Sequence, residues 1–342
     1  MGLYINSLQN SEILTSYNFA RNANFVFSEI VSIEEYEHIK NEYTEIIQQD
    51  EFTIFYINRN IQISEDDVIF TNTYFLEDLF TYLYKVKSLS NLKLITHQSD
   101  QVIGKKLFFK KPECIKDWYG ININYYSKDL HPIPLGISNN WSPKNLKKNQ
   151  YNKFEDHSNK INKAYVNFEV NTNYIHRKKI LNRLKNSKFA KLENEKIGLD
   201  EYISNLNKFK YSVCPYGNGP DTHRLWESLY AGSVPIVFDH ITYKTVENLP
   251  VIKIKDLKNI NLEFIEKKFD EIKFTQYEKL SVNWWIDRIN GNKLGIKKSF
   301  KEVISKDSLD KIKHNYKTKI KQQQKLKKVK TYTRKILNKI GF

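Results

Sequence analysis

The stretch YSVCPYGNGPDTHRLWESLYAGSVPIVF, residues 211–238, places a block of polar residues between two apolar runs. The apolar ends, YSVC and VPIVF, are typical of buried β-strands. Between them PYGNGP is an expected turn, and DTHRLWESLYA is an expected helix with Asp221 as its N-cap and Gly232 at its end. The stretch therefore predicts a βαβ unit.

The rest of the chain repeats this alternation, which is typical of α/β layers with parallel sheets. Further strands are expected at residues 51–58, 66–73, 91–100 and 164–169, and helices at 74–89, near 175–184 and at 199–210. A Lys- and Asn-rich stretch follows HPIPLGISNNWSP (131–143) and marks a boundary. We expect two domains, at 1–140 and 141–305, and a basic tail at 306–342.

Composition limits the classes of protein to which the chain can belong. The 342 residues are 40% hydrophobic, enough for one large core or two ordinary ones. The two cysteines, Cys114 and Cys214, match no zinc-ligand or disulfide spacing, which favours a reducing cytoplasm. We see no signal-peptide pattern and no apolar run of transmembrane length, so we expect a cytoplasmic protein that is soluble or peripheral to a membrane.

The net charge of +16 is concentrated at the C-terminus. Residues 311–342 carry 12 Lys and Arg and no acid, which leaves +4 for the preceding chain. Apolar residues recur among these bases at roughly helical spacing: Ile312, Tyr316, Ile320, Val329, Ile336, Leu337 and Ile340. The tail is therefore expected to be a basic amphipathic helix. Three interpretations stay open: a solvated helix, a helix on anionic lipid, or a nucleic-acid contact.

The βαβ unit at residues 211–238 has the features of an anion site. The N-terminus of a helix at the carboxyl end of a strand offers free N–H groups and a partial positive charge. Arg224, in the first helical turn, can add a bidentate contact to the same anion. Glu227 lies three residues on and can accept hydrogen bonds from sugar hydroxyls. Arg224 and Glu227 can equally be a surface pair on an ordinary capped helix.

The segment CPYGNGPDTHRLWESLYAGSVPIV resembles the donor-site signature of exostosin-like glycosyltransferases and, more loosely, the corresponding segment of bacterial α1,3-fucosyltransferases. Weaker resemblance in HPIPLGISNNW and YVNFEVNTNYIHRKKIL extends the similar region to residues 133–251. The resemblance implies a GT-B fold, with two Rossmann-like domains facing a central cleft. It also implies a glycosyltransferase with a nucleotide-sugar donor and a glycan or lipid-linked glycan acceptor, as in capsule or lipopolysaccharide synthesis.

Carried over to this chain, the resemblance implies that Arg224 contacts the donor pyrophosphate and Glu227 the ribose. The same pocket would be lined by Asn218, Gly219, Asp221, Thr222 and His223. Arg177, in the first turn of the preceding expected helix, is placed to supply a second positive charge. It can also be solvent-exposed beside Lys178 and Lys179.

The expected chemistry needs no metal or other cofactor, because Arg side chains and a helix N-terminus can stabilise a departing nucleoside diphosphate. The nearest acidic pair of the metal-binding type, Asp66 and Asp67, precedes its strand and is expected in a turn.

An inverting enzyme also needs a general base that faces the cleft. ITHQSD ends an expected strand, which makes Asp100 the preferred candidate and His97 the second, with Glu77 and Asp78 behind them. His97 can instead be a buried strand-end histidine and Asp100 a turn residue.

The alternative to an enzyme is a non-catalytic basic protein that binds nucleic acid or anionic membrane through its tail. Such a protein would show basic and aromatic residues interleaved across a folded surface. In this chain the bases lie in the tail, so we expect an enzyme whose residues 311–342 meet an anionic membrane, and no nucleic-acid partner.

Overall fold

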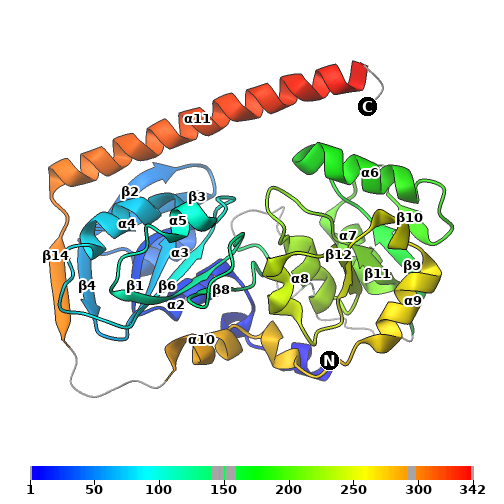
Figure 1. Ribbon diagram of the computed structural model, residues 1–342, viewed down its shortest axis with the longest axis horizontal. Coiled ribbons are helices and arrows are strands. Elements are labelled where there is room, and N and C mark those ends of the chain that lie inside the picture. The colour runs from blue at the N-terminus through cyan, green and yellow to red at the C-terminus, as the bar shows by residue number, and fades with distance from the viewer. Residues whose placement is uncertain are drawn as a thin grey trace.

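The computed structural model of the protein describes residues 2–139, 146, 150, 159–193, 195–291 and 298–339. Two β-sheets with flanking helices form two lobes that lie side by side, and one long helix runs along them (Figure 1). The α/β class expected from the alternating pattern is confirmed.

The sheet of the first lobe has seven strands in the order β2-β3-β1-β5-β6-β7-β8. Its strands are β1 (Phe25–Ser32), β2 (Thr44–Gln49), β3 (Thr53–Asn58), β5 (Val68–Asn72), β6 (Leu92–His97), β7 (Ile115–Gly120) and β8 (Leu130–Pro132). Strand β1 and the run from β5 to β8 are parallel, whereas β3 is antiparallel to β1 and β2. The sheet is therefore mixed. A hairpin turn joins β2 to β3, and in this turn Asp50 accepts hydrogen bonds from the N–H groups of Phe52 and Thr53.

Five α-helices belong to this first part of the chain: α1 (Gly2–Ser7), α2 (Ser16–Arg21), α3 (Ile33–Ile39), α4 (Leu76–Leu83) and α5 (Lys105–Phe108). Helix α4 occupies part of the helix expected at residues 74–89. Its buried residues include Leu76, Leu79, Phe80 and Leu83, the face that the apolar spacing predicted.

The sheet of the second lobe has five strands in the order β10-β9-β11-β12-β13, and all of its pairs are parallel. Its elements are β9 (Ile161–Val166), α6 (Tyr174–Leu184), β10 (Ala190–Leu192), α7 (Leu199–Lys208), β11 (Phe209–Val213), α8 (His223–Tyr230), β12 (Val234–Phe238), β13 (Ile252–Ile254) and α9 (Leu262–Glu271). The βαβ unit predicted at residues 211–238 is present as β11, α8 and β12. Gly232 follows α8 with φ of +70°, a conformation that glycine adopts without strain.

One local prediction in this unit is wrong. Thr222, not Asp221, is the N-cap of α8, and its side chain makes no capping hydrogen bond. The Asp221 side chain is buried and accepts hydrogen bonds from the Leu135 N–H at 2.9 Å and from Trp226 Nε1 at 3.0 Å. A buried carboxylate whose oxygens already accept from Leu135 and Trp226 is not available to cap the helix.

The chain returns to the first lobe after the second sheet. Helix α10 (Val282–Asn290) contacts α2, and β14 (Ser299–Val303) pairs with β4 (Asn60–Ser64) in a separate two-stranded sheet. Both elements lie within the expected domain 141–305, yet they pack against the first lobe. Helix α11 (Lys306–Lys339) follows, in the region expected to form a helical tail.

The two lobes share a hydrophobic core. One continuous cluster of buried side chains includes Phe70 and Ile95 from the first sheet, Tyr165 from the second sheet and Trp226 from α8. This shared core brings the carboxyl ends of the parallel strands of both sheets toward one region between the lobes, the place where α/β proteins bind ligands.

Candidate binding cavity between the lobes

A cavity of about 380 Å³ lies between the lobes. The first lobe contributes residues that follow β6 and β7, and the second lobe contributes α6 and the loop before α8. Eight of the residues singled out from the sequence line it: His97, Asp100, Arg177, Asn218, Gly219, Asp221, Thr222 and His223. Its volume is within the range of small-ligand sites.

The loop before α8 contacts the first lobe directly. Asn218 Nδ2 donates to Asp100 Oδ2 at 2.9 Å, which joins residues 118 positions apart in sequence. A Cβ atom on Gly219 would lie 2.0 Å from Asn122 Oδ1, so only glycine permits this approach without rearrangement. The PYGNGP turn therefore serves as part of the interface between the lobes and as a wall of the cavity.

Arg177 is buried, with 6% of its surface exposed. Its Nε donates to the Tyr216 carbonyl at 2.8 Å and its Nη1 to the Glu169 carbonyl at 2.7 Å. Burial, assisted by the charge of Arg224, lowers the pKa of Arg177 to about 10. The described hydrogen-bond partners of this guanidinium are neutral carbonyls, so its positive charge can attract a bound anion.

Arg224 and Glu227 face α7 and are not among the residues that line the described cavity. The Arg224 guanidinium carbon lies 5.5 Å from the centre of the Tyr202 ring, and its Nε is buried without a hydrogen-bond partner. Glu227 Oε2 accepts from the Tyr202 hydroxyl at 2.7 Å. Tyr202 therefore holds both members of the pair, and Glu227 is bound by a phenol and not by Arg224.

The two histidines of the cavity differ in which ring nitrogens are engaged. His97 Nδ1 accepts from the Gln98 N–H at 2.8 Å, and its Nε2 donates to the Pro134 carbonyl at 3.2 Å. Burial lowers the pKa of His97 to about 3, so the ring stays neutral. With both nitrogens in use, His97 is poorly placed to take a proton from a substrate.

His223 is exposed, and its Nδ1 donates to the Gly136 carbonyl at 2.7 Å. A carbonyl only accepts, so Nδ1 carries the proton and Nε2 is the acceptor nitrogen of the neutral ring. His223 Nε2 and the exposed Asp100 carboxylate are therefore two candidate proton acceptors among the described residues that line this cavity.

Glu77 and Asp78, the carboxylates ranked after Asp100 as candidate bases, are not among the residues that line the cavity. Glu77 pairs with Lys110 and with Lys319 of α11, and its hydrogen bond with Lys110 lowers its pKa. Burial raises the pKa of Asp78, which also bonds to Asn315 of α11. Both residues face α11.

Buried Asp221 supports the cavity wall. Burial raises its pKa to about 7, against the lowering effect of the hydrogen bonds from Leu135, Trp226 and Thr222. Leu135 leads out of the first lobe and Trp226 belongs to α8, so this carboxyl group ties the two lobes together.

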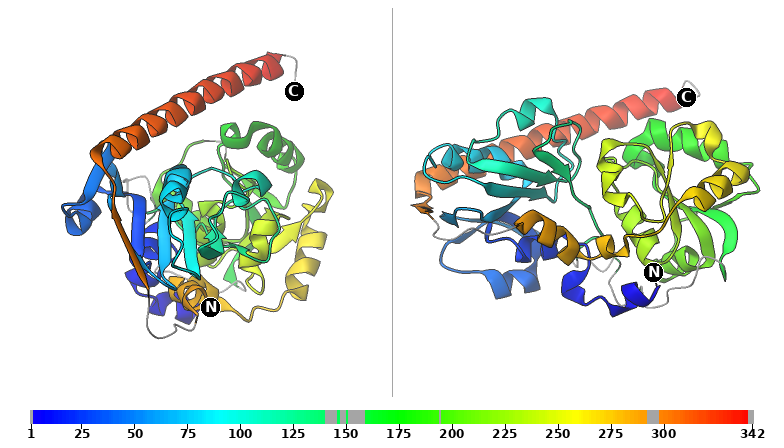
Figure 2. Two further views of the ribbon diagram at one scale, coloured as in Figure 1. Left: turned by 60° about the vertical axis from the view of Figure 1, so that its left-hand side comes forward. Right: turned by 60° about the horizontal axis from the view of Figure 1, so that its bottom comes forward.

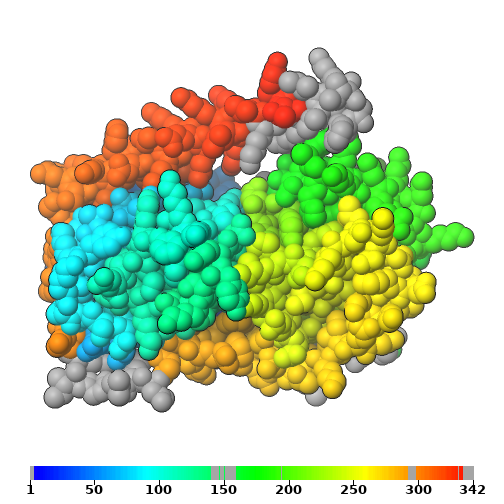
Figure 3. All heavy atoms as spheres, viewed as in Figure 1, coloured from blue at the N-terminus to red at the C-terminus, as the bar shows by residue number. Residues whose placement is uncertain are grey.

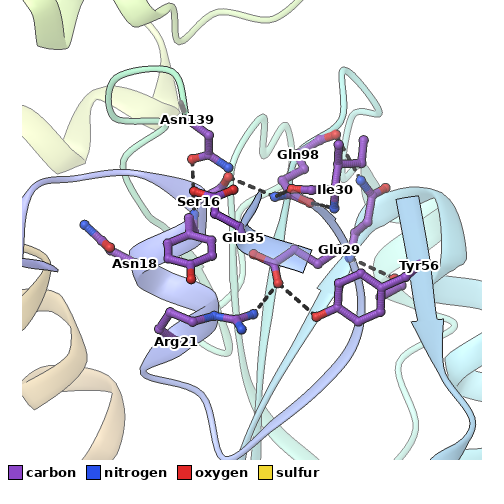
Figure 4. A network of polar contacts seen from close by, with 12 residues as sticks. Ser16, Asn18, Arg21, Glu29, Ile30, Glu35, Tyr56, Gln98 and Asn139 are labelled. Atoms are coloured by element: carbon purple, nitrogen blue, oxygen red, sulfur yellow. Dashed lines mark hydrogen bonds and ion pairs between the residues drawn. The ribbon is translucent and has the colours of Figure 1, made fainter. Parts of the chain in front are cut away.

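The structure adds residues that sequence reasoning missed. Gln98 has a φ of +61° and lines the cavity, and its side chain bonds both the N–H and the carbonyl of Ile30 and the Ser16 hydroxyl (Figure 4). Asn122, at the end of β7, shares with Asp100 the position after a strand, a signal that was present in the sequence. Tyr202 had no such signal, because its spacing is that of a buried helix face.

Comparison with known proteins finds no family model and no curated protein that matches the chain. The described residues contain no group of three or more His, Cys, Asp or Glu side chains arranged to hold a metal ion. Asp67 lies in a turn, where it accepts from the Ser64 N–H at 2.7 Å. None of the helices in the part of the chain that the structure describes has the length and apolar content needed to cross a bilayer.

Proposed function

We propose that the protein is a glycosyltransferase of the GT-B type. It would transfer a sugar from a nucleotide-sugar donor to a glycan acceptor in bacterial surface polysaccharide synthesis, such as that of capsule or lipopolysaccharide. The observation that carries this proposal is a pair of arginines, Arg177 and Arg224, near the carboxyl ends of the parallel strands. Neither has a described ion pair with a carboxylate.

The two arginines supply what a departing nucleoside diphosphate requires. Transfer breaks the bond between the anomeric carbon and the diphosphate oxygen, and negative charge develops on the diphosphate. Pre-positioned guanidinium groups at a partly water-excluded site stabilise that charge. Glu227, whose Oε2 accepts from the Tyr202 hydroxyl, is the group that we assign to the ribose hydroxyls.

On the acceptor side, Asp100 is the proposed general base. The acceptor oxygen forms the new bond to the anomeric carbon, and its proton passes to the Asp100 carboxylate. Asp100 is exposed in the cavity, and Asn218 holds one of its two oxygens.

Thermal denaturation with UDP-, GDP-, CMP- and dTDP-sugars tests donor binding. A ligand at 100 times its Kd adds about 2.7 kcal/mol to the free energy of unfolding, so one nucleotide class should raise the Tm clearly. The same donor should leave the Tm of an Arg177→Ala variant almost unchanged. The absence of a shift with every nucleotide-sugar would contradict the proposal.

Replacing Asp100 by Asn should lower the transfer rate about 10²- to 10⁴-fold, the usual contribution of a general base, because an amide does not take the acceptor's proton. Donor affinity, measured by calorimetry, should change little. His223→Ala is the comparison variant. If transfer persists in Asp100→Asn and is lost in His223→Ala, the base is His223 and the assignment to Asp100 is wrong.

Chelation tests the metal-independent mechanism. Because two arginines and the N-terminus of α8 provide positive charge for the leaving group, EDTA should leave most of the turnover intact. Assays before and after chelation, and with Mg²⁺ or Mn²⁺ restored, provide the measurement. Loss of turnover with EDTA and recovery with either ion would show that a metal ion, and not the pair Arg177 and Arg224, stabilises the leaving group.

A further inference from the structure

Helix α11 is divided into two parts by its contacts. The first part is docked on the first lobe, where Leu309, Ile312 and Tyr316 are buried in the hydrophobic core. Lys319 Nζ donates to the Tyr74 carbonyl at 2.9 Å, and the Tyr74 hydroxyl donates to Gln323 Oε1 at 3.2 Å. The docked part therefore extends as far as Gln323.

Beyond Gln323 the described side chains are exposed. Leu326 and Val329 are each 61% exposed and Tyr332 is 68% exposed, values unusual for large apolar residues spaced three apart. Figures 1 and 2 show this part of α11 projecting past the first lobe, and Figure 3 shows it along one edge of the molecule.

The exposed apolar stripe does not continue the docked face. At about 100° per residue, the mean direction of Leu326, Val329 and Tyr332 lies roughly 130° around the axis from that of Leu309, Ile312 and Tyr316. Extending the docked contact along the same helix would therefore leave Val329 and Tyr332 unburied. The stripe needs a different partner.

We propose that the free part of α11, residues 325–339, lies on an anionic lipid bilayer. This segment carries seven Lys and Arg and no acidic residue, so its charge complements an anionic surface. Its apolar stripe supplies the face that an interfacial helix buries at the boundary between headgroups and acyl chains. Nucleic acid would satisfy the charge and leave the apolar stripe in water, which is why the bilayer is the better fit.

The place where α11 leaves the first lobe connects this surface to the cavity. Tyr74, which holds Gln323, also lines the cavity. A bilayer bound from Leu326 onward would thus lie close to the cavity. This last step rests on the proposed function: the bilayer would present an acceptor anchored in the membrane to the transferase.

The test compares the full chain with a chain that ends at Gln324, by co-sedimentation with vesicles of phosphatidylcholine and phosphatidylserine at about two to one. The truncation keeps every docked contact of α11, so its Tm should match that of the full chain. Vesicle binding should fall at least about tenfold on truncation and should weaken as salt rises. Equal binding by the two chains would overturn the proposal. So would full-chain binding to pure phosphatidylcholine of the same strength.

A second variant separates the bilayer from a polyanion. Leu326→Ser, Val329→Ser and Tyr332→Ser together keep every basic residue and should lower vesicle binding about tenfold or more. Gln324→Ser with Thr331→Ser, on the other face of the helix, is the matched control and should bind as the full chain does. If the triple variant still binds vesicles fully, or if the full chain binds a short RNA and no vesicle, the surface is a polyanion site and the proposal fails. These assays contain no donor, so their failure leaves the transferase proposal standing.

Discussion

Replacing Arg224 by Ala should lower the turnover of sugar transfer about 30- to 1,000-fold, which corresponds to about 2 to 4 kcal/mol of lost transition-state stabilisation. The Arg224 Nε is buried without a hydrogen-bond partner, and the described contact of the guanidinium is with the ring face of Tyr202. Removing such a group costs the fold little, so the Tm should be nearly unchanged. Steady-state kinetics with the nucleotide-sugar that raises the Tm would measure the loss.

Two further variants show whether the loss comes from the position of the charge. Arg224→Lys should recover part of the turnover, because an ammonium keeps the charge and loses the bidentate geometry. Arg183→Ala, an exposed arginine on α6, should behave like the native protein. Native turnover in Arg224→Ala would remove Arg224 from the diphosphate site, and an equal loss in Arg183→Ala would point to a general effect of charge.

The second large effect concerns stability. The carboxyl group of Glu29 on β1 is fully buried and accepts hydrogen bonds from the Arg21 guanidinium and, at 3.1 Å, from the Tyr56 hydroxyl (Figure 4). Glu29→Ala should lower the free energy of unfolding by about 3 kcal/mol, because Tyr56 and Arg21 lose their acceptor. We expect the lower end of the range for a buried pair, since 27% of the Arg21 side chain reaches solvent. Urea denaturation gives the value, and exposed Glu34→Ala should change it by less than about 0.5 kcal/mol.

The same carboxyl group should make stability depend on pH. Burial raises the pKa of Glu29 to about 8, against the opposing effects of Arg21 and Tyr56. In the unfolded chain its pKa is about 4.3, so between these values the folded state holds more protons and stability falls as pH rises. In the Glu29→Gln variant, the urea concentration at the midpoint of unfolding should decline less between these pH values than it does in the native protein. An unchanged pH profile would show that Glu29 is ionised throughout.

The sequence by itself determined the features that depend on near neighbours. Apolar runs with Gly232 between them predicted β11, α8 and β12, because burial and a positive φ at the helix end are local requirements. The clustering of Arg177 with the residues before α8 was also predictable, since parallel strands bring their carboxyl ends to one edge of a sheet. Asp100 belongs to the other sheet, and only the resemblance led us to expect it at the same cleft.

Only the tertiary structure decided what each polar side chain does there. Asp221 has the sequence position of a helix cap, yet Leu135 and Trp226 take its carboxylate. Tyr202, which has the spacing of a core residue, orients Glu227, and the apolar residues of α11 divide into a docked and a free face. Periodicity specifies which face of an element is buried. The group that meets that face comes from far along the chain, and its identity depends on how the two lobes pack together.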